Sequence, residues 1–190
     1  ICMAAGSLSF APLSFGDTRT MISDLPPLLV NPEGNPIRTV PEWKEQRALI
    51  RQRWLEYLGA LKPNPSAPVL KVLKEDRPEN LIRQLVSYES EPGITVKGYL
   101  IKPAKITKAL PGVVAMHSTS DTEMLYIAGV KEGKIVPFGY RLAKQGFVVF
   151  CPQCFLMHEK GDQTPAQITR RFQQRHPGSK GMAKMLFDAQ

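Results

Sequence analysis

Residues 110–119, LPGVVAMHST, and residues 147–150, FVVF, decide the fold. In both stretches a short run of apolar residues, Val113 to Met116 and Phe147 to Phe150, has the character of a parallel strand buried on both faces. Between them, Val136 to Gln145 predicts a helix that Gly146 ends. Because such a crossover is right-handed, the two strands are expected to be parallel neighbours in an α/β sheet.

The residues upstream of this unit predict a hairpin. Ile82 to Glu89 and Val96 to Lys102 are rich in β-branched and aromatic residues, and Pro92-Gly93 between them is a turn signal. Leu110-Pro111-Gly112 then introduces the first buried strand. The expected order is therefore two antiparallel strands, followed by a strand, a helix and a parallel strand.

A helix is predicted before the hairpin. Thr39-Val40-Pro41-Glu42 combines capping-box spacing with a proline in the first turn, and the helix is expected to run to about Gly59. Its apolar stripe is interpreted as core anchors: Trp43, Ile50, Trp54, Tyr57 and Leu58. Asp17 to Arg38 is rich in Pro, Asn and Gly and is interpreted as an extended arm laid over a domain.

Length, composition and charge exclude several classes of protein. A chain of 190 residues with 43% hydrophobic residues favours one folded domain. No stretch approaches the roughly 18 uncharged apolar residues that a membrane-spanning helix needs. The net charge of +8 is spread along the chain, and no interleaving of aromatic and basic residues indicates a nucleic-acid module. We therefore expect no membrane span and no nucleic-acid partner.

The cysteines and the start of the chain bear on its compartment. The chain has three cysteines, Cys2, Cys151 and Cys154, and this small, odd number excludes a disulfide framework. Ile1 to Gly16 is apolar and rich in small residues, and it resembles the tail of a secretory signal as closely as it resembles an unstructured terminus. The compartment stays open, with a secreted or periplasmic location slightly favoured over the cytoplasm.

From about Arg83 to Gln190 the sequence resembles α/β-hydrolases of the dienelactone hydrolase and acetyl xylan esterase-like type. The resemblance is carried by residues 110–119, by residues 140–149 (YRLAKQGFVV) and by residues 181–188 (GMAKMLFD). It implies an α/β fold, the N-terminal half of a hydrolase, in which an antiparallel hairpin leads into a parallel sheet with flanking helices. The expected division is an arm over residues 1–38 and the start of the hydrolase domain over residues 39–190.

The same resemblance implies roles at the end of the first buried strand. In that fold the loop there supplies a backbone N–H to an oxyanion hole, and Ser118 and Thr119 occupy that place. His117-Ser118 replaces the family's common His-Gly, so the loop less readily takes a positive φ. We interpret His117 as a residue that shapes the loop by hydrogen bonding. His158 and Glu159 are expected at the edge of the pocket.

The sequence has no Gly-x-Ser-x-Gly elbow, which an enzyme of this family needs for its nucleophile. Gly178-Ser179-Lys180-Gly181 has the wrong spacing and precedes a helix. We therefore expect the nucleophile beyond Gln190 and no activity from these residues alone. The implied substrate is a small-molecule ester, hydrolysed without a metal or organic cofactor. The nearby carboxylates are interpreted as solvated surface groups: Asp121, Glu123, Glu132, Glu159 and Asp162.

Three alternatives remain at this stage. Cys151-Pro152-Gln153-Cys154 has the spacing of a redox pair. Its two thiols, with His158 and His176, could instead hold a structural zinc ion. A non-catalytic interaction module with a hydrolase-like fold is the third. The apolar faces of the two buried strands would be partly uncovered in half a domain, which predicts association through the sheet surface.

Overall fold

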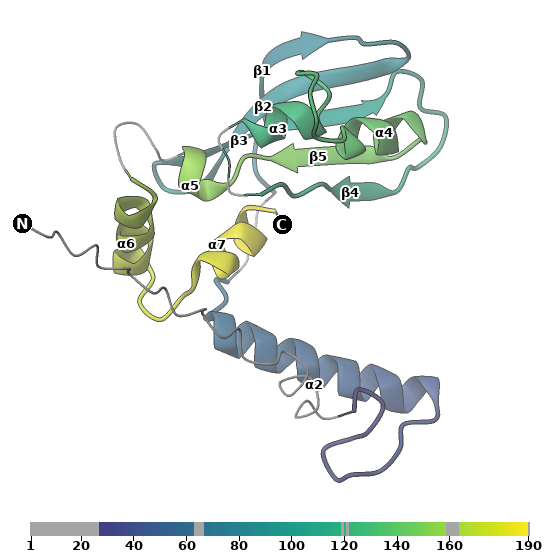
Figure 1. Cartoon of the computed structure of the whole chain (residues 1–190), viewed down its shortest axis with the longest axis vertical. Helices are drawn as coiled ribbons and strands as arrows, with labels where there is room; N and C mark the ends of the chain where they lie inside the picture. The colour runs from purple at the N-terminus through teal and green to yellow at the C-terminus, as the bar shows by residue number, and fades with distance from the viewer. Residues whose placement is uncertain (1–26, 63–66, 119, 121, 159–163, 190) are drawn as a thin grey trace, which may run out of the picture. The chain divides into compact units, whose positions relative to one another are not determined.

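The computed structural model describes residues 27–62, 67–118, 120, 122–158 and 164–189. The chain divides into two compact units, residues 1–51 and residues 52–190. Within the second unit, the described residues form a five-stranded sheet in the order β1-β2-β3-β5-β4 (Figure 1). None of the described helices is long and apolar enough to cross a membrane.

The predicted hairpin is present and longer than expected. β2 (Leu81–Glu91) and β3 (Ile94–Pro103) pair antiparallel, and Gly93 turns the chain between them with a φ of +76°. β1 (Lys71–Asp76) pairs antiparallel with β2 on the outer side. The sequence did not reveal β1 because every one of its residues is exposed, so burial imposes no apolar alternation on it.

The two strands of the parallel unit are β4 (Gly112–Val114) and β5 (Val148–Pro152), and they pair in parallel as predicted. α4 (Phe138–Lys144) lies in the crossover, and Gly146 follows it with a φ of +97°. The crossover also contains α3 (Glu123–Ile127), a short helix that the sequence did not predict. Figure 1 shows α3 and α4 against the sheet, where α4 contacts β3 and β5.

The main core lies between the sheet and these two helices. Its buried members come from β2, β3, β5, α3, α4 and the residues directly after β4 and α3: Leu81, Ile101, Ala115, Met124, Ile127, Ala128, Ala143, Val149 and Cys151. The interpretation of the first strand as buried on both faces is wrong, because Val114 is 42% exposed and Met116 39%. β4 pairs only with β5 among the described strands, so no described strand pairs with its outer edge.

α2 (Val40–Leu58) begins and ends where the sequence predicted. Glu42 Oε2 accepts hydrogen bonds from the amides of Arg38 and Thr39, which form the expected cap. The core-anchor interpretation is wrong for two of its aromatic residues, because Trp54 is 58% exposed and Tyr57 61%. The two rings instead pack edge to face against each other.

The C-terminal part of the described chain is helical. It contains α5 (Phe155–His158), α6 (Pro165–Arg175) and α7 (Gly181–Asp188), of which the sequence predicted only α7. α6 begins with a capping box between Thr164 and Gln167 that we did not recognise in the sequence. Cys154, Phe155, Ile168 and Phe172 form a second buried apolar cluster, with Met185 packed against it. This cluster joins α5, α6 and α7.

Candidate functional site

The carboxyl ends of β4 and β5 meet at one edge of the sheet. Val114 is in register with Phe150, and the amide of Ala115 donates to the carbonyl of Phe150 at 2.8 Å. The segments that follow β4 and β5 then leave the sheet beside the same small pocket. Its walls are Met116, His117, Pro152, Gln153, Cys154, Phe155, Met185 and Asp188. The expectation that the two strand ends come together is confirmed, and this edge is where open parallel sheets bind ligands.

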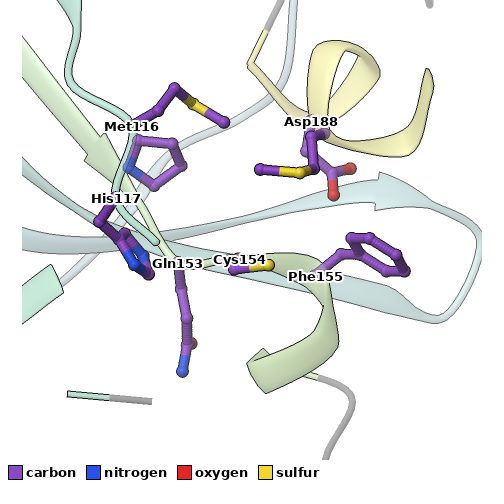
Figure 2. Close-up of a pocket in the computed structure, with 8 residues that line it drawn as sticks. Met116, His117, Gln153, Cys154, Phe155 and Asp188 are labelled. Carbon is purple, nitrogen blue, oxygen red and sulfur yellow. The ribbon is translucent and has the colours of Figure 1, made fainter. Parts of the chain in front are cut away.

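The pocket is narrow and mostly apolar, with room for about one water molecule. Figure 2 shows Asp188 reaching into it from α7, opposite Cys154 and Phe155 on the segment after β5. Two buried polar atoms in this wall, His117 Nε2 and Asp188 Oδ2, have no hydrogen-bond partner among the described residues. His117 Nδ1 lies 2.6 Å from the carbonyl oxygen of Ser118, so a proton on Nδ1 donates there and leaves Nε2 an acceptor.

The contact from His117 to Ser118 is of the kind expected of a residue that shapes the loop, and that role stays a prediction. Ser118, the first of the two predicted oxyanion residues, is exposed directly after His117. Thr119, the second, lies outside the described residues, as do Asp121, Glu159 and Asp162. His158 is the last residue of α5, and its side chain also lies outside the description.

Glu123 is partly exposed, as a surface carboxylate would be, but it also binds Ser118. Its Oε2 accepts two hydrogen bonds from Ser118, one from the backbone amide at 3.0 Å and one from the side-chain hydroxyl at 2.5 Å. Glu123 is the first residue of α3, five positions after Ser118. By contrast, Glu132 is exposed, as expected. The predicted oxyanion donor at Ser118 thus already binds an anionic oxygen of the same chain.

A buried polar network, which the sequence did not reveal, lies behind the pocket. Lys184 on α7 is completely buried, and its Nζ lies 3.0 Å from Ser90 Oγ, 2.8 Å from Glu91 Oε1 and 2.5 Å from Asp188 Oδ1. The second oxygen of Glu91 pairs with Nε2 of His176. We call Lys184, Ser90, Glu91, Asp188 and His176 the Lys184 network. It ties α7 and the end of α6 to the end of β2.

The two carboxylates of the Lys184 network have pKa values shifted in opposite directions. Burial raises the pKa of Asp188, and the nearby Lys184 only partly opposes this effect. Burial also acts to raise the pKa of Glu91, but hydrogen bonds from His176 and Lys184 outweigh it and bring the pKa below its ordinary value. On sequence alone, Lys184 and Asp188 at a spacing of four are typical of an exposed helical ion pair. This spacing therefore gives no indication that both side chains are buried.

The two thiols do not have the environment of a redox pair. Cys151 is fully buried in the main core, and burial raises its pKa to about 12. Cys154 belongs to the second cluster, and burial raises its pKa as well. An attacking thiol needs a lowered pKa, so these contacts argue against the redox alternative. His176, one of the four proposed zinc ligands, is engaged by Glu91 instead.

Ser179, the serine of the mis-spaced Gly178-Ser179-Lys180-Gly181 sequence, has a structural contact. Its hydroxyl donates to the carbonyl of Gly59 at 2.6 Å, and the amide of Lys180 donates to the carbonyl of Leu58 at 2.8 Å. Gly59 has a φ of +61°, and a Cβ there would lie 2.5 Å from the carbonyl oxygen of Gly178. This turn therefore holds the end of α2 against the start of α7.

The strand order and a comparison with solved structures identify the class of fold. A candidate acetyl xylan esterase from Bacteroides fragilis matches with a TM-score of 0.61 at 14% sequence identity. The match covers 90% of this chain and 46% of that protein. At this identity the likeness shows the fold alone. The chain has an α/β-hydrolase-type fold in which an antiparallel hairpin leads into a parallel pair of strands with flanking helices.

Glucuronoyl esterases also match, with lower scores. One from Solibacter usitatus has a TM-score of 0.47 at 14% identity, over 68% of this chain and 40% of its own. One from Teredinibacter turnerae has a TM-score of 0.48 at 16% identity, over 84% of this chain and 43% of its own. This chain thus spans less than half the length of each of these three proteins. No protein-family profile and no curated protein matches its sequence.

Proposed function

We propose that this chain is part of a serine hydrolase that cleaves carboxylic esters or related acyl bonds. The observation that carries the proposal is the position of the His117-Ser118 loop. It follows β4 at the edge where β5 also ends, in a fold of the α/β-hydrolase type. In such sheets the loop after this strand provides one of the two amides of the oxyanion hole.

In the proposed reaction a serine beyond Gln190 attacks the ester carbonyl, and an acyl-enzyme forms and is hydrolysed by water. Negative charge develops on the carbonyl oxygen as the tetrahedral intermediate forms. Backbone N–H groups of Ser118 and Thr119 would stabilise this oxygen, because fixed dipoles need no reorganisation during the reaction. His117 would hold the loop through its contact with the carbonyl of Ser118. The proposal needs no metal or organic cofactor.

A fluorophosphonate probe tests the proposal, because it labels only an activated serine. The longest natural polypeptide that contains residues 1–190 should be labelled at one serine beyond Gln190 and should hydrolyse p-nitrophenyl acetate. Residues 1–190 alone should do neither. Acetylated xylan and a methyl ester of glucuronic acid extend the assay to the two kinds of ester named for the structural neighbours.

A serine-to-alanine variant at the labelled position is the matched control and should abolish both labelling and turnover. If the natural polypeptide folds but is not labelled, the hydrolase proposal fails. The chain would then be a non-catalytic interaction module. That alternative is supported by exposed apolar side chains at the edge of the sheet, Val114 at the end of β4 and Met116 just after it.

A further inference from the structure

Ser118 directs two hydrogen-bond donors at a single anionic oxygen. Its backbone amide and its hydroxyl both donate to Oε2 of Glu123, at 3.0 Å and 2.5 Å. Hydrogen bonds to a charged acceptor are about twice as strong as those between neutral groups. Two donors on one negatively charged oxygen are also what a tetrahedral oxyanion requires. The site is therefore built for an anionic oxygen, and a side chain of the same protein fills it.

The two partners are anchored to different degrees. α3, which carries Glu123 at its start, is fixed in the core by Met124 and Ile127, 6% and 1% exposed. The end of α3 is held by Arg83, whose Nη1 donates to the carbonyls of Ala128 and Gly129 at 3.1 Å and 2.5 Å. The side chain of Glu123 is only partly buried. Its carboxylate can therefore rotate away from Ser118 while the helix stays in place.

We propose that the amide and hydroxyl of Ser118 form a binding site for a carboxylate or oxyanion, and that Glu123 occupies it as an internal plug. The inference rests on the proposed function, and it adds that the substrate's carbonyl oxygen must displace Glu123 before the amide of Ser118 can act. An external anion competes poorly in the intact protein, because Glu123 is attached to the chain and its effective concentration is high. Removal of Glu123 opens the site.

Acetate is the probe, and the backbone amide of Ser118 is the reporter. The protein is labelled with ¹⁵N-serine, and the Ser118 signal is assigned by its disappearance in Ser118→Ala. In Glu123→Ala the Ser118 amide should shift saturably with acetate, and the affinity should exceed that of the unmodified protein at least about tenfold. Glu123→Gln keeps the length of the side chain and removes its charge, so its affinity for acetate should fall between the two.

Two further variants make the test specific. Glu132→Ala removes an exposed carboxylate from the loop after α3 and should leave the response of the unmodified protein unchanged. In the Glu123→Ala background, Ser118→Ala removes the hydroxyl donor and should weaken acetate binding, followed through the ¹⁵N signal of a labelled alanine at position 118. Circular dichroism establishes that each variant is folded.

A folded Glu123→Ala protein whose Ser118 amide does not respond to acetate overturns the inference. An equal response in Glu123→Ala and the unmodified protein overturns it too, because Glu123 would then not occupy the site. Neither result depends on turnover. If acetate binds as expected while fluorophosphonate labelling fails, the anion site stands and the hydrolase function falls.

Discussion

The Lys184 network and the contact between Ser118 and Glu123 are both charged arrangements, and they differ in burial. Lys184 is completely buried, and its partners Glu91 and Asp188 have side chains only 10% and 5% exposed. Ser118 is exposed and Glu123 partly buried. A buried charge that loses its partner is strongly destabilising, whereas an exposed one is solvated by water. The Lys184 network is therefore expected to stabilise the fold, whereas the contact between Ser118 and Glu123 can be replaced by a contact with a ligand.

The largest effect is expected from Lys184→Met. The substitution keeps a long apolar side chain but leaves the carboxylates of Glu91 and Asp188 without their buried cation. The free energy of unfolding should fall by about 3–5 kcal/mol, measured by urea denaturation. Adding Glu91→Gln and Asp188→Asn removes both carboxylate charges and should recover part of the loss. A decrease in the free energy of unfolding of less than about 1 kcal/mol would show that water reaches Lys184. The two regions would then not differ in burial as described.

A smaller loss is expected from Arg83→Met, which tests how the end of α3 is anchored. Arg83 binds Asp76 through two nitrogens and donates to the carbonyls at the end of α3. Because Asp76 is partly exposed, the expected loss is about 2 kcal/mol in urea denaturation. Arg77→Met removes an exposed ion pair with Glu75 and is the matched control, with no measurable change expected. Equal effects of the two variants would contradict the structural role of Arg83.

The decrease in the free energy of unfolding at low pH should distinguish the two buried carboxylates, Glu91 and Asp188. The pKa of Glu91 is lowered in the folded state, so its contribution is complete above its ordinary pKa of about 4.3 and is lost as the pH falls through the lower folded value. Glu91→Gln should therefore reduce the decrease in the free energy of unfolding between pH 6 and pH 3. The pKa of Asp188 is raised, so protonation favours the folded state, and Asp188→Asn should enlarge that decrease.

Urea denaturation across this pH range provides the measurement. Glu79→Gln is the matched control, because Glu79 also has a lowered pKa but lies on the surface, beside Lys144 and Tyr140. It should reduce the decrease at low pH less than Glu91→Gln does, because water and salt screen the charges of a surface pair. Changes of the same sign in Glu91→Gln and Asp188→Asn would contradict the opposite pKa shifts on which the prediction rests.

The smallest effect on stability is expected from Glu123→Ala. The side chain is partly exposed, and water can take over the two donors of Ser118. The free energy of unfolding should change by less than about 1 kcal/mol in urea denaturation, even though acetate binding changes strongly. A loss comparable to that of Lys184→Met would make Glu123 a structural residue. The difference between the two regions would then disappear.

Much of the fold could be predicted because its signals are local. The apolar runs at 113–116 and 147–150 and the glycines at 93 and 146 indicated the hairpin and the parallel unit. β1 was missed because its residues are all exposed, and α3 and α5 because helices of five and four residues leave almost no periodicity. The exposure of Trp54 and Tyr57 escaped prediction because an apolar stripe does not reveal whether anything covers it.

The order of residues along the chain was enough to bring His117 and Cys154 to one edge of the sheet, since strand direction and crossover handedness follow from short-range sterics. Tertiary structure alone decided which charges would meet. Ser90 and Lys184 are 94 positions apart, and only the packing of α7 against the end of β2 makes them partners. The contact between Ser118 and Glu123 likewise depends on where α3 packs. Glu123 lies five residues after Ser118, and its carboxylate reaches the Ser118 amide only because α3 directs it back toward that residue.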